Sequence, residues 1–276
     1  MLLRMLTCIL LGWSAPSAAA DDLLLFDGHL HYSGDAWEQF PPEKVMRLLD
    51  EAKIGKALLS STPIEGALRL YKHAPERFVP ELRVYRKATS LATWFQERQT
   101  WYKDPDTIPF LEAELKRGIY KGIGEFHVNG NEIDTPVMRR IADLAVEHKI
   151  HLHAHSDADA IAKLFEFNPR VRVIWAHAGM TTDPTTVGAF VAKYPSLWVE
   201  LSYRNDVVSG GELNPIWRKL FLANPDRFLW GSDTWTPARW PEVPMLAQQA
   251  RAWLALLPRD VAEKIAYKNA QMLFGF

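Results

Sequence analysis

The sequence predicts an α/β fold in which eight parallel strands, each followed by a helix, close into a single barrel. First, eight short apolar runs alternate with amphipathic stretches from residue 23 onward, which is typical of parallel strands joined by helices. Second, residues 21–276 come close to the ~250 residues that eight such units require. Third, no G-x-G-x-x-G turn follows the first apolar run, which disfavours an open sheet that binds dinucleotides.

The expected strands are apolar runs that end where polar residues begin. The first reads "LLLFDGHLH" and the fifth "IHLHAHS", so both carry histidines near their ends. The full set is 23–31, 56–61, 77–85, 120–128, 150–156, 171–179, 197–203 and 227–233.

The expected helices have apolar residues at helical spacing. The stretch 41–55 begins with two prolines, which the first turn of a helix tolerates, and stops at Gly55. Similar stretches occupy 107–118, 135–149, 157–167, 183–194, 213–223 and 242–257, and a last helix at 259–276 closes the chain. Residues 86–106 form an inserted segment after the third strand, which we expect to be a lid or a flank of the barrel.

The first twenty residues differ from the rest and predict a signal peptide. Arg4 precedes the apolar run "MLTCILLGW", and three alanines end the segment just before Asp21. The alternative is a buried N-terminal helix. Cys8 is the only cysteine, so a chain cleaved before residue 21 has neither a disulfide nor a thiolate. We expect the mature domain, 21–276, to be periplasmic or secreted.

The composition of the chain limits the classes of binding partner that we expect. The formal net charge is −1, with 48% apolar and 24% charged residues, which describes an ordinary globular domain. Nucleic acid and anionic membranes are therefore disfavoured as partners, and the N-terminal apolar run is too short for a permanent membrane anchor. We expect a small-molecule substrate. The sequence leaves open whether the chain forms a homo-oligomer.

Histidines gather at the expected strand ends. Alternate residues of a strand share a face, so His29 and His31 point the same way, about 6 to 7 Å apart along the backbone. Such a pair by itself is also compatible with two buried histidines that bind backbone carbonyls. In a closed barrel the carboxyl ends of all strands converge on one face, however. The residues placed there are His29, His31, Glu125, His127, His153, His155, His177 and Asp233.

These motifs together resemble a known family. "DGHLH" after the first strand, "HAHSD" after the fifth, "IWAHAGM" after the sixth, "WGSDT" after the eighth and the terminal "NAQMLFGF" resemble the amidohydrolase-related branch of the amidohydrolase superfamily, over essentially the whole mature chain. The resemblance implies a distorted (β/α)8 TIM barrel with one or two divalent metals at its mouth. Zinc is the first choice of metal and manganese the alternative.

The resemblance also implies roles for single residues. His29 and His31 resemble the first-strand metal ligands, and His155 resembles the fifth-strand ligand. His177 resembles the sixth-strand ligand or proton shuttle, and Asp233 the carboxylate of the eighth strand.

Two positions stay open. Many two-metal relatives bridge their ions with a carbamylated lysine on the fourth strand, whereas "GIGEFHV" offers Glu125, with Lys121 a weaker candidate. Glu125 could instead simply pair with an arginine at the barrel mouth. On the fifth strand His153 and His155 both point inward. We prefer His155 as the ligand because it comes last, before a serine and an aspartate that cap a helix.

The residues implied for this site indicate a hydrolase. A Zn²⁺-like ion lowers the pKa of bound water from about 15.7 toward roughly 7. Asp233 would accept the proton of that water, and His177 would polarise the substrate carbonyl. The expected reaction is attack on a C–O or C–N bond of a lactone, an ester or an amide.

The substrate is less defined by the sequence. Arg83, Arg204 and Arg239 follow strand ends and suit an anionic small molecule, and Trp235 could wall the pocket. Three alternatives stay open: a non-oxidative decarboxylase of an aromatic or unsaturated carboxylate, a phosphodiesterase, and an exported barrel that binds a metal or a ligand without catalysis. Retention of Asp233 beside the histidines argues against a pure binding protein, which needs no general base.

Overall fold

The computed structural model describes residues 22–276 and contains the expected sheet. Eight parallel strands follow one another in sheet order, each beside its neighbour along the chain except for a hairpin inserted before the last. The strands are β1 (Leu25–His31), β2 (Ile54–Ser60), β3 (Phe78–Leu82), β4 (Gly122–His127), β5 (His151–His155), β6 (Arg172–Trp175), β7 (Leu197–Glu200) and β10 (Phe228–Leu229). The signal-peptide prediction for residues 1–20 lies outside the described residues.

The gap between the first and last strands is nearly closed. β10 and β1 share no regular ladder, but two backbone hydrogen bonds join the chain on either side: Gly28 N–H donates to Trp230 O (2.7 Å) and Asp233 N–H donates to His29 O (2.6 Å). Gly28 permits this approach, since a Cβ there would lie 2.9 Å from Trp230 O. The predicted barrel is thus confirmed, with an irregular seam beside His29.

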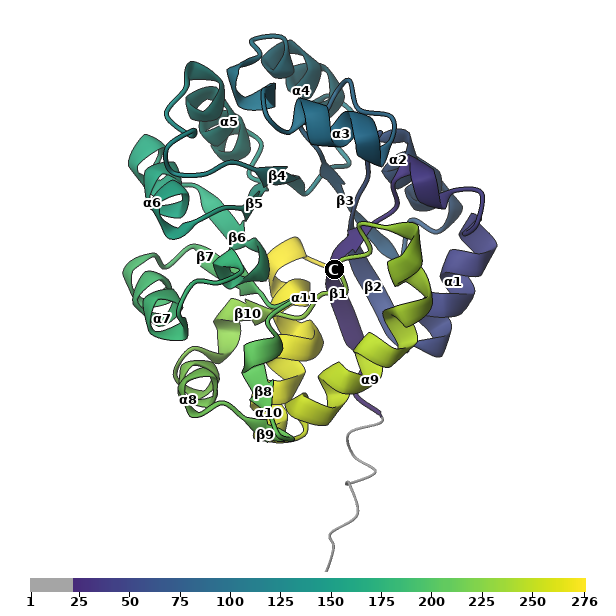
Figure 1. Cartoon of the computed structure of the whole chain (residues 1–276), viewed down its shortest axis with the longest axis vertical. Coiled ribbons are helices and arrows are strands. Elements are labelled where there is room, and N and C mark those ends of the chain that lie inside the picture. The colour runs from purple at the N-terminus through teal and green to yellow at the C-terminus, as the bar shows by residue number, and fades with distance from the viewer. Residues whose placement is uncertain (1–21) are drawn as a thin grey trace, which may run out of the picture.

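Helices surround the strands in chain order (Figure 1). Several begin with an N-terminal cap: Thr135 Oγ1 accepts Met138 N–H (3.2 Å), and the Asp157 carboxylate accepts Ala160 N–H (2.8 Å). The outer helices are α1 (Pro42–Glu51), α2 (Glu65–His73), α4 (Thr107–Leu115), α5 (Pro136–Glu147), α6 (Ala158–Phe167), α7 (Pro184–Lys193), α8 (Pro215–Ala223) and α9 (Val243–Leu254).

The structure changes some boundaries predicted from the sequence. The helix expected over 41–55 ends at Glu51 because Lys53 has a positive φ and Ile54 already begins the buried strand β2. Helix α2 lies between the second and third strands, where the alternation predicts a helix but the sequence pattern indicates no bounds for it. The C-terminal helix is divided into α10 (Arg259–Glu263), a wider π turn (Lys264–Lys268) and α11 (Asn269–Phe274).

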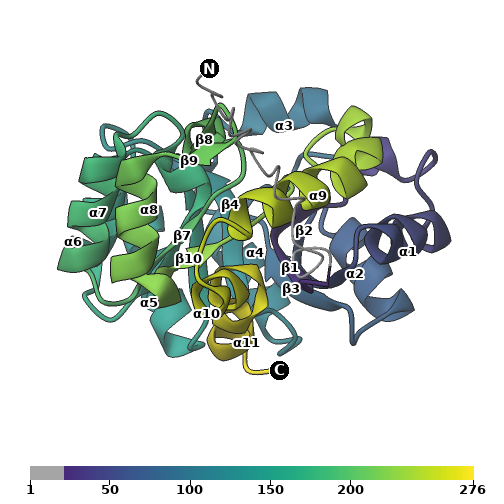
Figure 2. The same ribbon diagram turned by 90° about the horizontal axis from the view of Figure 1, so that it is seen from below.

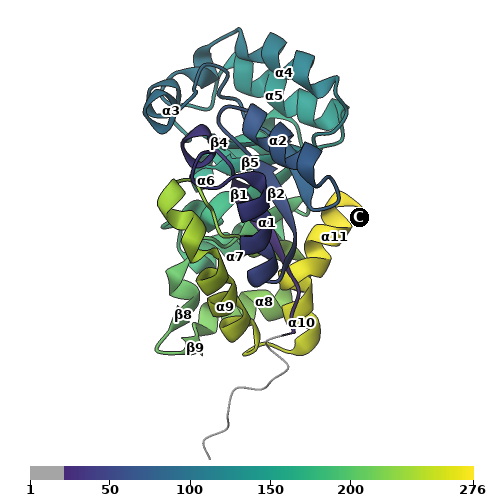
Figure 3. The same ribbon diagram turned by 90° about the vertical axis from the view of Figure 1, so that its right-hand side faces the viewer.

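The C-terminal segment covers one end of the barrel. Phe274 and Phe276 both stack on Phe26 of β1, with ring centroids 5.6 Å apart in each case. Figures 2 and 3 show α10 and α11 at the end of the barrel opposite to α3 (Leu91–Glu97). The amino-terminal end of the barrel is therefore sealed by apolar packing, which leaves the carboxyl ends of the strands for a site.

The inserted segment 86–106 contributes α3 and a short 3-10 helix (Trp101–Lys103). Ser90 and Thr93 cap α3 reciprocally. The helix lies at the same end of the barrel as the small hairpin β8 (Val208–Ser209) and β9 (Glu212–Leu213) (Figure 2). Among residues 22–276, none of the helices combines the length and the apolar character that a membrane crossing requires.

Candidate active site

Strand β1 brings its two histidines together. The Nε2 atoms of His29 and His31 are 3.1 Å apart, and both side chains are buried. The pairing of β1 with β2 shifts register between Asp27 and Leu30, so this part of the strand is irregular. Asp27 fixes the irregular stretch, because its Oδ1 accepts the backbone N–H of His29 (3.0 Å) and of Ser232 (2.9 Å).

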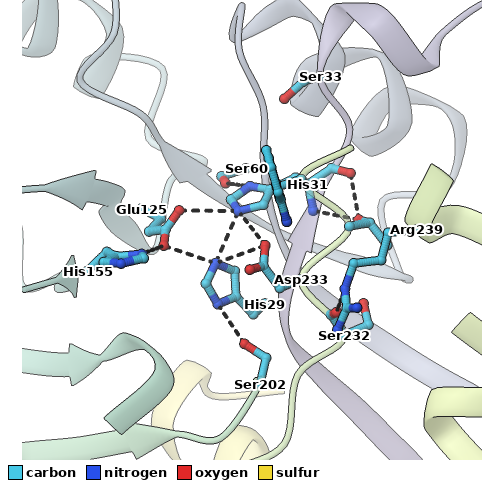
Figure 4. A network of polar contacts seen from close by, with 12 residues as sticks. His29, His31, Ser33, Ser60, Glu125, His155, Ser202, Ser232, Asp233 and Arg239 are labelled. Atoms are coloured by element: carbon cyan, nitrogen blue, oxygen red, sulfur yellow. Dashed lines mark hydrogen bonds and ion pairs between the residues drawn. The ribbon is translucent and has the colours of Figure 1, made fainter. Parts of the chain in front are cut away.

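The Nδ1 atoms of these histidines are already held by the protein. Figure 4 shows the contact of His31 with Ser60 and that of His29 with Ser202 Oγ (3.5 Å). His29 Nδ1 donates to Glu200 Oε2 (2.9 Å), and His31 Nδ1 lies 2.7 Å from Ser60 Oγ. A neutral imidazole that donates through Nδ1 has its lone pair on Nε2. The Nε2 atom of His29 is therefore prepared to accept a cation, and the Nε2 atom of His31 is likewise when Ser60 Oγ accepts from its Nδ1.

Two carboxylates face the same Nε2 atoms. Glu125 Oε1 lies 3.5 Å from His29 Nε2, and Glu125 Oε2 lies 3.3 Å from His31 Nε2. Asp233 Oδ1 lies 3.2 Å from His31 Nε2 and 3.7 Å from His29 Nε2. Lys121, the weaker bridging candidate, is exposed just before β4 and does not share this position.

The arrangement passes a simple test for a divalent cation. Asp233 Oδ1 is buried and accepts no hydrogen bond from the residues that the structure describes. Lone pairs on nitrogen and oxygen that converge in a buried space are unfavourable unless a metal cation or a proton compensates them. Imidazole nitrogen and carboxylate oxygen are ligands that suit zinc. His29, His31 and Asp233 accordingly form one of three ligand groups among residues 22–276 whose donor atoms lie within 4.8 Å of one another.

His177 completes this cluster from the end of β6. Its Nε2 lies 3.4 Å from Glu125 Oε1 and 3.8 Å from Asp233 Oδ2. Its Nδ1 donates to Ser202, whose Oγ (2.8 Å) in turn donates to Glu200 Oε2 (2.9 Å). The positive φ of His177, 55°, marks the turn that directs the ring inward. The predicted grouping of His177 with the first-strand histidines is thus observed.

The buried imidazoles and carboxylates of the cluster shift one another's pKa values. Burial opposes it, yet Asp233, Glu125 and Glu200 raise the pKa of His29 well above its ordinary value. Burial also opposes ionisation of Asp233, but His29 and His31 lower the pKa of Asp233 below its usual range. The pKa of Glu200 falls to about 2 against the effect of burial, because of His29. The carboxylates are therefore ionised at neutral pH and attract positive charge.

A second group of candidate ligands lies beside the first, formed by Glu125, His127 and His155. His155 Nδ1 lies 2.9 Å from Glu125 Oε1, and the rings of His127 and His155 stack at 4.3 Å. Glu125 belongs to both neighbourhoods, as its predicted bridging position requires. It also accepts a hydrogen bond from Arg83 Nη2 (3.1 Å), so the alternative of an arginine pair is present as well.

The proton of His127 can be placed from its partners. Tyr85 Oη accepts the backbone N–H of His127 (3.0 Å) and lies 2.8 Å from His127 Nδ1. The hydroxyl has one proton, and among the described residues Nδ1 is the one acceptor within hydrogen-bond distance of it. Tyr85 therefore donates to Nδ1, and a neutral His127 carries its proton on Nε2. His127 then faces the pocket as a hydrogen-bond donor, which makes it a weaker metal ligand than His29 or His31.

His153 occupies a different position from His155. Its Nδ1 lies 3.0 Å from Glu81 Oε2, and both side chains are fully buried. Its ring packs against His29 at 4.6 Å. His153 is in none of the three candidate ligand groups, whereas His155 is in one.

The residues predicted to bind substrate separate into two pairs. Arg83 and Trp235 line a pocket of about 260 Å³ above the cluster, and Trp235 Nε1 donates to Tyr203 Oη (2.8 Å). Arg204 and Arg239 do not line it. Arg204 forms two hydrogen bonds with Asp206 (2.8 Å each), and Arg239 Nε donates to Ser232 O (2.8 Å). These two arginines therefore hold the loops after β7 and β10.

Some residues of the site were missed in the sequence. Glu200 ends β7 in "LWVEL", the same signal of a carboxylate at the end of an apolar strand that pointed to Asp233. Ser60 ends β2 in the same way. Arg98 lies in the insertion and lines the pocket, and no sequence motif marks it.

Comparisons with known proteins agree with this geometry. The family model described as amidohydrolase matches residues 26–276. No curated protein matches the chain. Similar solved structures include a zinc-bound amidohydrolase from Burkholderia multivorans, with 13% identity, a TM-score of 0.58, and coverage of 92% of this chain and 99% of that one.

Two further similar structures are decarboxylases. A 2,6-dihydroxybenzoate decarboxylase in complex with 2,6-dihydroxybenzoate has 15% identity and a TM-score of 0.58, over 92% of this chain and 99% of that one. A dihydroxybenzoic acid decarboxylase from a Polaromonas species, with bound manganese and an inhibitor, has 15% identity and a TM-score of 0.57, over 91% and 97%. At these identities the likeness concerns the fold.

Proposed function

Because this chain belongs to the amidohydrolase family, we propose that it is a metal-dependent hydrolase that adds water across a C–O or C–N bond of a small substrate. Lactones, esters and amides are the proposed substrate classes. The observation that carries the proposal is the position of Asp233. Its buried Oδ1 faces His31 and His29 without a hydrogen bond, and the same carboxylate lines the pocket.

We propose that His29, His31 and Asp233 hold a divalent ion, with Glu125 and His177 beside it. Zinc is the proposed metal, because histidine and carboxylate ligands suit it, and manganese is the alternative. Zinc in the Burkholderia multivorans structure and manganese in the Polaromonas structure support this choice. A bound ion of this kind lowers the pKa of water and so provides hydroxide near neutral pH. Glu125 and His155 are the residues that would hold a second ion.

The chain's own residues supply the proton transfers. The low pKa of Asp233 keeps its carboxylate ready to accept a proton from the attacking water and to pass it to the leaving oxygen or nitrogen. His177 donates from Nε2 toward the substrate oxygen, since nearby carboxylates outweigh burial and raise its pKa. Ser202 and Glu200 fix the ring of His177 for this task.

Metal analysis followed by a turnover panel tests the proposal. The panel contains lactones, esters, amides, a phosphodiester and aromatic carboxylates, and its products are identified. We expect a bound divalent metal and hydrolysis of a C–O or C–N bond. Release of CO₂ from an aromatic carboxylate would instead establish the decarboxylase, and cleavage of the phosphodiester the phosphodiesterase.

A double variant distinguishes metal bound at the proposed site from metal bound adventitiously. Replacing His29 and His31 together by Ala should remove the ion, while the exposed His148→Ala should retain it. Unchanged metal content in the double variant would refute the site. A parent protein that binds metal but turns over nothing on the panel would support the non-catalytic barrel.

We also propose that the chain is exported and cleaved before Asp21, on the basis of its N-terminal charge, apolar run and alanines. N-terminal sequencing of protein from native cells tests this. An intact Met1 in a cytoplasmic fraction would contradict it.

A further inference from the structure

The pocket above the cluster has an apolar rim. Among the described residues, ten large apolar or aromatic side chains are exposed, and four of them line this pocket. They are Phe95, Met180, Tyr203 and Trp235, which come from α3 and from the loops after β6, β7 and β10. Such a concentration of exposed apolar surface around one concavity marks a binding site for an apolar or aromatic group.

Two arginines line the pocket, and of these only Arg83 makes side-chain hydrogen bonds to other described residues. Arg83 is buried and donates to Glu125 O (3.0 Å), Thr62 Oγ1 (3.2 Å) and Glu125 Oε2 (3.1 Å). Arg98, on the C-terminal end of α3, is half-buried over the Trp94 ring at 5.4 Å. Within residues 22–276 its guanidinium has no carboxylate at ion-pair distance and no side-chain hydrogen bond.

From these contacts we propose that Arg98 binds a carboxylate of the substrate and thereby determines its class. The substrate is then an aromatic or apolar compound with one carboxylate, whose acid group lies against α3 and whose reacting bond lies toward Asp233. The assignment of the reacting bond rests on the function proposed above. The binding of the carboxylate does not.

The surroundings of Arg98 favour a single planar anion. A guanidinium presents parallel N–H groups that match a carboxylate. His127 packs edge-on against the same Trp94 ring at 5.1 Å and also lines the pocket, so a second polar side chain lies on that wall. The opposite part of the pocket carries Glu125 and Asp233, which repel a ligand of higher negative charge.

Calorimetric binding of benzoate and of its neutral isostere benzamide tests the inference. Both ligands are measured on the parent, on Arg98→Gln and on the matched control Arg218→Gln, which removes an exposed arginine on α8. We expect Arg98→Gln to lower the affinity for benzoate by about tenfold or more, which is the usual effect of deleting a charged hydrogen bond. The affinity of Arg98→Gln for benzamide should stay within about threefold of the parent's. The affinity of the control variant for benzoate should do the same.

Further measurements distinguish the possible outcomes of this experiment. Arg98→Lys, which retains the charge, should recover part of the affinity, and metal-free protein should show the same dependence on Arg98. The inference fails if Arg98→Gln binds benzoate within twofold of the parent, or if the parent does not prefer benzoate to benzamide. Dependence on Arg98 in a protein that hydrolyses nothing would uphold this inference and reject the proposed hydrolase.

Discussion

Glu200 Oε2 lies 2.9 Å from His29 Nδ1, so a carboxylate at the end of β7 orients a histidine of β1 from beyond the intervening strand β10. Gly231 makes room for the contact, because a Cβ there would lie 2.5 Å from Glu200 Oε1 and 2.7 Å from His29 Cβ. The same carboxylate accepts from Ser202, which holds His177. One buried acid therefore sets the orientation of two rings of the site.

Glu200→Gln is expected to weaken metal binding. The amide oxygen is a weaker, uncharged acceptor for His29 Nδ1–H, so the ring is held less firmly in the form that has its lone pair on Nε2. Loss of such an outer partner of a ligand typically costs 10- to 100-fold in metal affinity. Competition with a chelator measures this loss, and the exposed Glu212→Gln serves as the control. Equal affinity in parent and variant would show that Glu200 does not position His29.

Tyr85→Phe is expected to change the proton position on His127. In the parent, long-range ¹⁵N–¹H NMR should show the Nε2–H form, because the tyrosine hydroxyl donates to Nδ1. The variant should show a mixture of both forms. It should also lose about 1–3 kcal/mol of unfolding free energy, since the backbone N–H of His127 is left without an acceptor. Tyr102→Phe is the control, and an Nδ1–H form in the parent would contradict the assignment.

His151, which lies outside the candidate site, should make the stability of the fold depend on pH. Burial lowers the pKa of His151 to about 3, from an ordinary value of 6.5. Between these values the unfolded chain binds a proton that the folded chain does not, so stability falls as the pH falls through this window. At pH 5 the expected loss from this group, relative to pH 8, is about 2 kcal/mol.

Urea unfolding of His151→Phe at pH 8 and pH 5 measures that contribution. The phenylalanine keeps the aromatic contacts of His151 with Trp198 and Phe274 but does not titrate. The variant should therefore lose about 2 kcal/mol less than the parent on acidification. The exposed His73→Phe should behave like the parent. Equal losses in parent and His151→Phe would show that His151 is protonated in the folded state.

The strands and the histidine cluster could be predicted because both depend on local pattern. An apolar run that ends in polar residues fixes where a side chain emerges, and a closed barrel brings all such ends together. This reasoning grouped His29, His31, His177 and Asp233 at one end of the barrel, and the structure brings these residues together there. It also predicted Arg204 and Arg239 as substrate-binding residues. Neither lines the pocket above the cluster, because their partners, Asp206 and Ser232 O, are set by loop conformation.

The absence of predicted bounds for the helices α2 and α3 has physical reasons as well. The buried side of α2 consists largely of Gly66, Ala67 and Leu70, and small residues give a weak apolar pattern. Gly66 is required there, since a Cβ would collide with Tyr32 O. For α3 a local signal did exist, the reciprocal cap of Ser90 and Thr93. That α3 supplies Arg98 to the pocket depends on tertiary packing and could not be predicted from the cap.

Asp233→Asn is expected to retain the fold and to abolish most turnover. The substituted amide keeps an oxygen at the position of a carboxylate oxygen, and the backbone N–H of residue 233 can still donate to His29 O. An amide cannot accept a proton at neutral pH, however, so the proposed general base is lost.

We expect kcat to fall roughly 10²- to 10⁴-fold, the range for removal of a positioned base. KM should change less, because the proton moves only on the way to the transition state. Kinetics on the substrate found in the panel, with metal content measured for each preparation, separates loss of the base from loss of the ion. Asp206→Asn is a matched control outside the pocket, where the acid pairs with Arg204. If Asp233→Asn keeps its metal and turns over within about threefold of the parent, then Asp233 is not the base, and His177 becomes the remaining candidate for proton transfer.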